Sequence, residues 1–247
     1  MSRPPPPELA IGAFAASIVR TLRATALPRL AGNTSYDKLV AIISSAGAIF
    51  LVASICAILS SRALPVMLIA PIGASALLLF AIPSSPLAQP WAIIGGNVVS
   101  ALVGVMTVKA APSLPIAAGL SVGLSLAAMS VLRCLHPPGG SMALTAVVGG
   151  EATRQMGFNF PFLVVGTSSC ALVLIGIAFH ALVKRTYPHR TLTADTAVEQ
   201  SAFCAADIDG ALRDVGEVFD ISKQDLEMIV RKVELNAAER RRNSRSR

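Results

Sequence analysis

A central block of 145 residues, 39–183, that is almost without charge constrains this chain more than any other feature. The block holds only five charged side chains, which are Arg62, Lys109, Arg133, Glu151 and Arg154. An ordinary soluble domain carries about 25% charged residues; this whole chain carries 14% and is 53% hydrophobic. Because a block with so little charge cannot present a hydrated surface, the sequence predicts a polytopic domain of membrane-spanning helices.

The block contains six apolar segments, at roughly 39–60, 65–82, 91–109, 114–132, 139–150 and 160–183. Four of them approach the length of about 20 residues that a spanning helix needs, whereas the second and fifth are short. Both short segments carry the pattern P-x-G-x-S, which begins at Pro71 in one and at Pro137 in the other, 66 residues apart. Each copy follows one long segment and precedes another, which indicates two three-segment repeats, 39–109 and 114–183. Three crossings per repeat make the second repeat inverted relative to the first, an arrangement common in transporters.

The predicted fold is therefore all-α, with about six spans in two inverted repeats, two broken helices and a soluble helical C-terminal region. The domain boundaries that we expect are 1–38, 39–183 and 184–247. Residues 8–30 are apolar with interspersed arginines, which favours an interfacial amphipathic helix. The C-terminal region carries 12 basic and 11 acidic residues and predicts a helical hairpin, 207–219 and 223–242. An apolar stripe on its second helix packs on the first helix or on a second subunit, so a homodimer is one expected partner.

Basic residues near the span ends predict the orientation, because cytoplasmic loops carry an excess of lysine and arginine. With six spans both termini lie on one side, together with nine such basic residues. Three lie on the opposite side, at Arg62, Lys109 and Arg154. We therefore expect a multi-pass protein of the inner or plasma membrane with both termini in the cytoplasm.

The composition also excludes some partners and chemistries. Two tyrosines, one tryptophan and the nearly uncharged centre leave no surface for nucleic acid, although the net charge is +7. The four cysteines form no CxxC pattern, and we expect no metal and no other cofactor. Glu151 is the one carboxylate in the central block, which disfavours an intramembrane enzyme.

The two broken segments indicate a binding site. Proline lacks an N–H group, so Pro71 and the Pro137–Pro138 pair break or begin helices. A helix start carries a partial positive charge, and glycine lets an anion approach the backbone closely. Two such starts near the membrane midplane would bind a small anion without lysine or arginine. The candidate binding residues are Pro71, Gly73, Ala74, Ser75, Asn97, His136, Pro137, Pro138, Gly139, Gly140 and Ser141.

Each of these residues also has a purely structural interpretation. Proline and glycine are frequent in membrane helices, where they often produce kinks alone. Ser75 and Ser141 either bind the ligand or cap and pack their helices. His136 either donates to an anion or occupies the core as a satisfied histidine, and Asn97 either binds the substrate or hydrogen-bonds across helices.

Three stretches resemble the HPP family of integral membrane proteins, which is named for its His-Pro-Pro signature: LHPPGGSMAL (135–144), APIGASALLLFAIPSSPLAQPWAIIGGN (70–97) and SALVGV (100–105). The resemblance covers about 39–183. Family members from cyanobacteria and chloroplasts are associated with nitrite transport, so the resemblance implies a transporter or channel for a small inorganic anion, with nitrite the first candidate. The alternative is a membrane-anchored scaffold or sensor that acts through its C-terminal helices.

Overall fold

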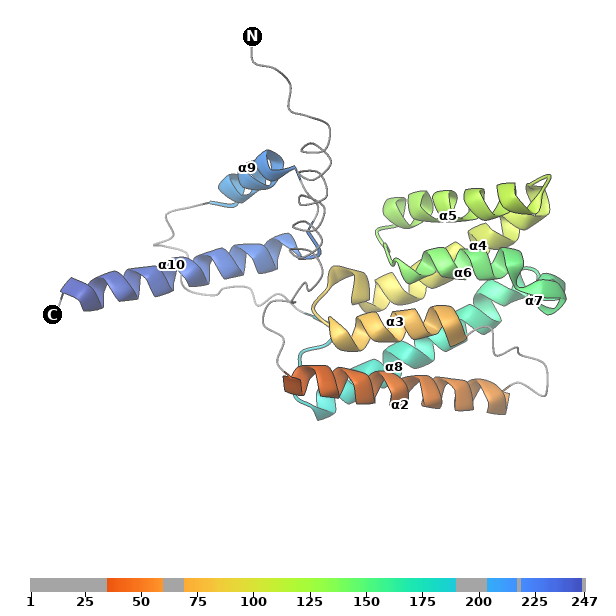
Figure 1. Ribbon diagram of the computed structural model, residues 1–247, viewed down its shortest axis with the longest axis horizontal. Helices are drawn as coiled ribbons and strands as arrows, with labels where there is room; N and C mark the ends of the chain where they lie inside the picture. The colour runs from red at the N-terminus through yellow and green to blue at the C-terminus, as the bar shows by residue number, and fades with distance from the viewer. Residues whose placement is uncertain (1–34, 60–68, 190–203, 217–218, 246–247) are drawn as a thin grey trace, which may run out of the picture. The chain divides into compact units, whose positions relative to one another are not determined.

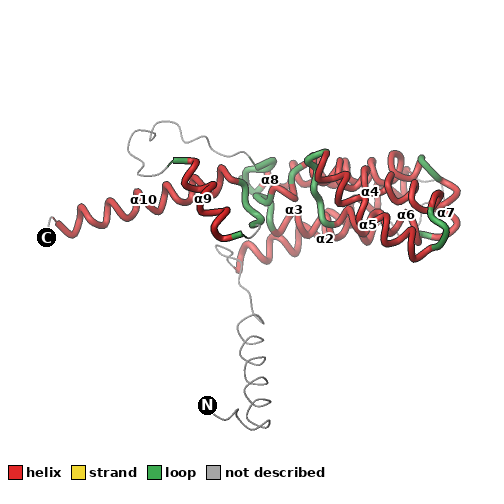
Figure 2. The backbone as a smooth tube through the Cα atoms, turned by 90° about the horizontal axis from the view of Figure 1, so that it is seen from above, coloured by secondary structure: helices red, strands yellow, loops and turns green. Residues whose placement is uncertain are grey.

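The computed structural model of this protein describes residues 35–59, 69–189, 204–216 and 219–245. The interfacial helix expected at 8–30 lies outside these residues. By its internal contacts the chain forms two units, Met1–Leu39 and Val40–Arg247, and the structure below concerns the second unit together with the helix that begins at Ser35. In the described part every regular element is helical, with short loops between helices and no strand (Figure 2).

The central block forms a series of helices that follows the six predicted segments (Figure 1). In chain order these are α2 (Ser35–Leu59), α3 (Ile69–Ala81), the short turn η2 (Pro86–Ala88), α4 (Pro90–Ala110), α5 (Leu114–Val131), α6 (Pro138–Val148), α7 (Gly150–Met156), the π-helical turn η3 (Phe160–Gly166) and α8 (Thr167–Leu182). The C-terminal helices are α9 (Ala205–Val215) and α10 (Lys223–Arg245).

Helix length separates the two kinds of segment as the sequence predicts. In the described residues, four helices are long and apolar enough to cross a membrane: Ser35–Ile58, Pro90–Ala110, Leu114–Val131 and Phe160–Leu182, the last of which joins η3 to α8. The segments that carry the P-x-G-x-S pattern form the short apolar helices α3, with 13 residues, and α6, with 11 residues. A helix of 11 residues is only about 16 Å long, roughly half the thickness of the hydrocarbon core.

Helix α4 forms the centre of the bundle and packs most closely against α6 and α5. Small residues permit this approach. A Cβ atom on Gly104 would meet the Ala143 carbonyl of α6 and would lie 2.7 Å from the Cβ of Ala146. Figure 1 shows α3 beside α6, and α2 contributes Ala48 and Val52 to the buried core.

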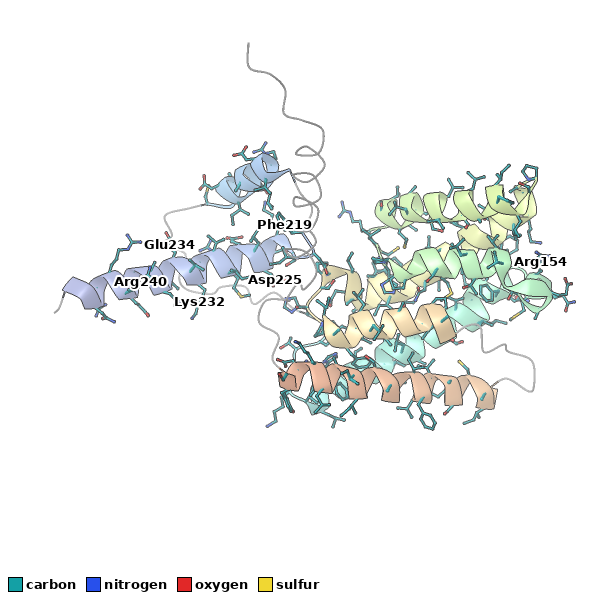
Figure 3. The ribbon with its side chains drawn as sticks, in the orientation of Figure 1. Arg154, Phe219, Asp225, Lys232, Glu234 and Arg240 are labelled. Carbon is teal, nitrogen blue, oxygen red and sulfur yellow. The ribbon has the colours of Figure 1, made fainter. Side chains whose placement is uncertain are left out.

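The C-terminal helices have the local features that the sequence predicts. Ser222 caps α10, because its Oγ accepts from the Asp225 N–H at 3.1 Å. Glu227 and Arg231 form an ion pair at 2.7 Å one turn apart. Charged side chains continue along α10, of which Lys232 and Arg240 are labelled in Figure 3.

Candidate functional site, a buried polar network

The two broken segments meet through one hydrogen bond. His136, in the loop before α6, places its Nε2 atom 2.8 Å from Ser75 Oγ, on the second turn of α3. Both side chains are fully buried. The sequence repeat does not pair these two positions with each other, since Ser75 corresponds to Ser141. The contact therefore arises from packing between α3 and α6.

Asn97 of α4 extends this contact into a network. Its Nδ2 atom donates to Ser75 Oγ and to Ser169 Oγ of α8, both at 3.2 Å. Ser75, Asn97, His136 and Ser169 all have no exposed surface, although their neighbours are largely apolar. Asn97 Oδ1 is buried and has no hydrogen-bond partner among the described residues. Because buried polar groups are nearly always paired, an unpaired acceptor indicates a position where a donor can bind.

The His136 ring has a neutral and a charged form, and the hydrogen bonds of the network can be made with either form. Its Nδ1 atom lies 2.8 Å from the Leu87 carbonyl of η2, which can only accept, so Nδ1 carries hydrogen. With a neutral ring, Nε2 accepts from the Ser75 hydroxyl. With a charged ring, Nε2 donates to Ser75 Oγ, and the hydroxyl turns to the Pro71 carbonyl at 3.2 Å. The hydrogen-bond geometry around His136 is therefore compatible with either protonation state of the ring.

The backbone at the start of α6 differs from the predicted anion site. The N–H groups of Gly139 and Gly140 donate to the carbonyls of His136 and Pro137, at 2.8 and 3.0 Å. Prolines 137 and 138 have no N–H group, so the first turn of α6 presents few free donors.

Gly139 allows α6 to pack closely against α4. A Cβ atom there would lie 2.6 Å from Ser100 Oγ and 3.0 Å from the Gly96 carbonyl, both on α4. Gly140 has open space, with its nearest neighbour, Val122, at 3.9 Å.

Several other predicted residues lie away from the network. Ser141 is exposed, and its hydroxyl donates to the Pro138 carbonyl of its own helix at 2.7 Å. Ala74 and Pro137 are exposed, and nothing lies within 4 Å of a Cβ atom on Gly73. The structure thus brings together Ser75, Asn97 and His136, with Pro71 beside them, from the predicted set.

Ser169 is the member that the sequence interpretation missed. The available signal was the pair Ser168–Ser169 within an apolar segment.

A G-x-S-x-G sequence at Gly119–Gly123 is unrelated to the site, because it lies inside α5 and the Ser121 hydroxyl donates to the Ala118 carbonyl at 2.8 Å. A nucleophile elbow requires a strand-to-helix turn instead.

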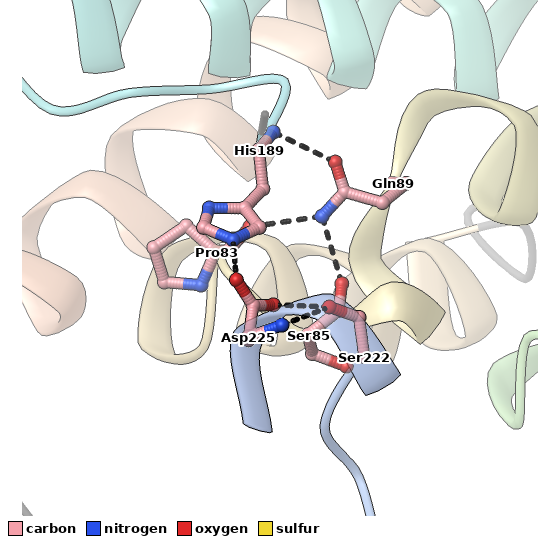
Figure 4. A network of polar contacts seen from close by, with 6 residues as sticks. All are labelled: Pro83, Ser85, Gln89, His189, Ser222 and Asp225. Carbon is pink, nitrogen blue, oxygen red and sulfur yellow. Dashed lines mark hydrogen bonds and ion pairs between the residues drawn. The ribbon is translucent and has the colours of Figure 1, made fainter. Parts of the chain in front are cut away.

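A second polar cluster joins the loop before α4 to the C-terminal region (Figure 4). Gln89 Nε2 donates to the Ser85 carbonyl at 2.8 Å, and Gln89 Oε1 accepts from the His189 backbone N–H at 2.9 Å. The His189 ring contacts Asp225 of α10 at 2.8 Å, and Ser85 Oγ donates to Asp220 at 2.8 Å.

Tyr187, in the segment after α8, also contacts this loop, because its hydroxyl donates to the Ala88 carbonyl of η2 at 2.9 Å. Burial raises the pKa of this hydroxyl, so Tyr187 stays a donor over the accessible pH range. The turn η2 thus contacts His136 of the network through Leu87 and the segment after α8 through Ala88.

Long apolar helices, two half-length helices and a polar network buried among them define a polytopic integral membrane protein. Residues 32–188 match the family described as HPP, transmembrane region, which is well over half of the chain, and the chain belongs to this family. The match confirms the resemblance drawn from the His-Pro-Pro signature.

Two curated relatives are transmembrane proteins of Dictyostelium discoideum. They are 38% and 36% identical to this chain over 127 and 128 residues. The aligned part covers 49% and 50% of this chain, and 44% and 41% of the respective relatives, so the chain matches less than half of their length. No solved structure matches the chain.

Proposed function

We propose that this protein is a transporter or channel for a small inorganic anion, with nitrite the first candidate. The observation that carries the proposal is the convergence of Ser75, Asn97, His136 and Ser169 from three helices and one loop. Polar side chains inside a membrane domain are costly, and they commonly mark a pathway for a polar solute. A helical anchor without transport activity has no need of such a network.

The chemistry of the network suits an anion. An anion accepts hydrogen bonds, and after a rearrangement of the helices the network can offer the hydroxyl groups of Ser75 and Ser169, the Asn97 N–H groups that now donate to these serines and, in its charged form, the imidazolium of His136. The unpaired Asn97 Oδ1 is an acceptor, so it would face a proton donor and not the anion. Among the described residues no carboxylate hydrogen-bonds to the four network side chains, and the one acid in the central block, Glu151, is exposed on α7. Carriage of a proton on His136 together with the anion would make the pair electrically neutral.

Entry of the ligand requires a movement of the helices, because all four side chains are fully buried. Helices α3 and α6 are the natural moving parts. Both are short, and the hydrogen bond between Ser75 of α3 and His136 of the loop before α6 can be exchanged for contacts with the ligand. Alternating access in inverted-repeat transporters uses such rearrangements around a central site.

The test is anion uptake by proteoliposomes that contain the purified full chain, with nitrite, nitrate, formate and chloride offered separately. We expect Ser75→Ala and Ser169→Ala to reduce uptake of the preferred anion. The matched control is Ser130→Ala, because the Ser130 hydroxyl is exposed and donates within its own helix at 2.7 Å. Equal uptake by all three variants and the unmodified protein would contradict the proposed pathway. Absence of uptake for all four anions would contradict the proposed substrate class.

The second candidate function is a membrane-anchored scaffold or sensor. Two contacts favour a role for the C-terminal region: Asp220 accepts from Ser85 of the loop before α4, and Asp225 contacts His189 of the segment after α8. Helix α10 also exposes Ile229, Val233 and Leu235. We propose that these apolar residues mediate a homodimer, with the lipid bilayer as the other partner of the protein. Crosslinking in native membranes that yields only monomer, with and without residues 207–247, would contradict the dimer. We propose no enzymatic activity.

A further inference from the structure

A cavity of about 410 Å³ lies where α4 ends, α5 begins and α7 packs beside them. It is separate from the polar network, since Asn97 lies near the start of α4 and the cavity is lined by residues from Val105 onward. Val105, Ala117 and Ala146 contribute apolar wall. Two cationic side chains, Lys109 and Arg154, also line it.

These two cations are half of the basic residues in the central block, and they come from positions 45 residues apart in the sequence. Arg154 is labelled on α7 in Figure 3. No acidic residue lines the cavity, and the ion pairs found in the described helices include neither Lys109 nor Arg154. Lys109 Nζ lies 5.8 Å from the centre of the Phe158 ring. Two positive charges at one cavity without a carboxylate repel each other and attract an anion.

The neighbouring acid, Glu151, is on α7 three residues before Arg154, but it forms no ion pair with Arg154 among the described residues. Its Oε1 accepts from Gln155 Nε2 at 3.1 Å, and Glu151 does not line the cavity. The polar wall adds Ser113, whose side chain makes no capping bond to α5, and Thr153. The Thr153 hydroxyl donates to the Gly149 carbonyl at 3.1 Å, so Ser113 is the hydroxyl that can join the arginine and the lysine as a donor to a phosphate-like oxyanion.

The size of the cavity limits which ligands can bind. Its volume falls in the range of about 300–1,000 Å³ that is usual for small-molecule sites, so it admits an oxyanion with an attached group as well as a free ion. We propose that Lys109 and Arg154 form an oxyanion-binding site for a phosphate-like group. The group comes either from an inorganic oxyanion in solution or from the headgroup of an anionic phospholipid. This site does not depend on the proposed transport function.

The experiment uses the full chain in nanodiscs. In phosphatidylcholine, inorganic phosphate is titrated calorimetrically; in discs that also contain phosphatidylglycerol, native mass spectrometry counts the phosphatidylglycerol retained by the protein. The variants are Lys109→Gln and Arg154→Gln, with Arg133→Gln as the control because Arg133 is exposed and does not line the cavity.

We expect each cavity variant to reduce the affinity for the ligand roughly tenfold or more, because it removes one charge-assisted hydrogen bond. The control should leave the affinity unchanged. Loss of phosphate affinity identifies a soluble oxyanion, and loss of retained phosphatidylglycerol identifies a lipid headgroup. Lys109→Arg should retain binding, which separates loss of charge from loss of folding. The proposal is overturned if neither probe responds to the two cavity variants, or if Arg133→Gln has the same effect as they do.

Discussion

Replacement of Gly96 by alanine should separate the loop that carries His136 from α4. A Cβ atom at this position would lie 2.6 Å from the His136 Cβ and 2.7 Å from the Cys134 carbonyl. Ordinary contact begins at 3.4 Å, so the His136 Cβ must move away by about 0.8 Å. The bond from His136 Nε2 to Ser75 Oγ is 2.8 Å long, and a displacement of this size lengthens it to at most about 3.6 Å, which is beyond useful hydrogen-bond length.

The cost has two parts. Overpacking in a well-packed core costs about 1–3 kcal/mol, and loss of one buried hydrogen bond costs about 0.5–1.5 kcal/mol. Together they predict a destabilisation of about 1.5–4.5 kcal/mol for Gly96→Ala. The control is Gly123→Ala on α5, where nothing lies within 4 Å of the added atom. Alanine is the better helix former by about 1 kcal/mol, so the control should be neutral or slightly stabilising.

The assay is thermal and denaturant unfolding of the two purified variants in the same detergent, followed by proteoliposome uptake. We expect Gly96→Ala to unfold at clearly lower temperature than Gly123→Ala and to lose uptake while still inserting into the membrane. If the two variants have equal stability and equal uptake, the close approach of the His136 loop to α4 does not hold in the protein.

The remaining predictions concern the site and the topology. Ser141→Ala should retain uptake where Ser75→Ala loses it, because Ser141 is exposed and hydrogen-bonded within its own helix. Equal losses in the two variants would instead place the binding site at the starts of α3 and α6. His136→Gln should alter the pH dependence of uptake if the imidazole carries a proton, and an unchanged profile would restrict His136 to a structural role. Reporter fusions after Lys184 and after Lys109 should report the cytoplasm and the opposite side, respectively; an external location after Lys184 would contradict the inverted repeat.

Several features followed from the sequence because they depend on local composition. The near absence of charge between 39 and 183 required helices in a membrane, since only internal hydrogen bonding satisfies the backbone there. Prolines at 71, 137 and 138 marked the two short helices, because proline restricts the backbone wherever it occurs. The signature around His136 is a continuous run of residues, so it indicated the family by itself, and the match over residues 32–188 confirms that family.

Only the tertiary structure decided which of these residues share a site. Ser75 and Ser141 occupy the same place in the sequence pattern, yet one is buried against His136 and the other is exposed. Ser169 joined the network without any motif, and Gly139 proved to be a packing residue against α4. The physical reason is that burial and hydrogen-bond partners depend on which side of each helix meets a neighbour from a distant part of the chain. A repeat in the sequence preserves residue types, but it does not preserve the neighbours that surround them.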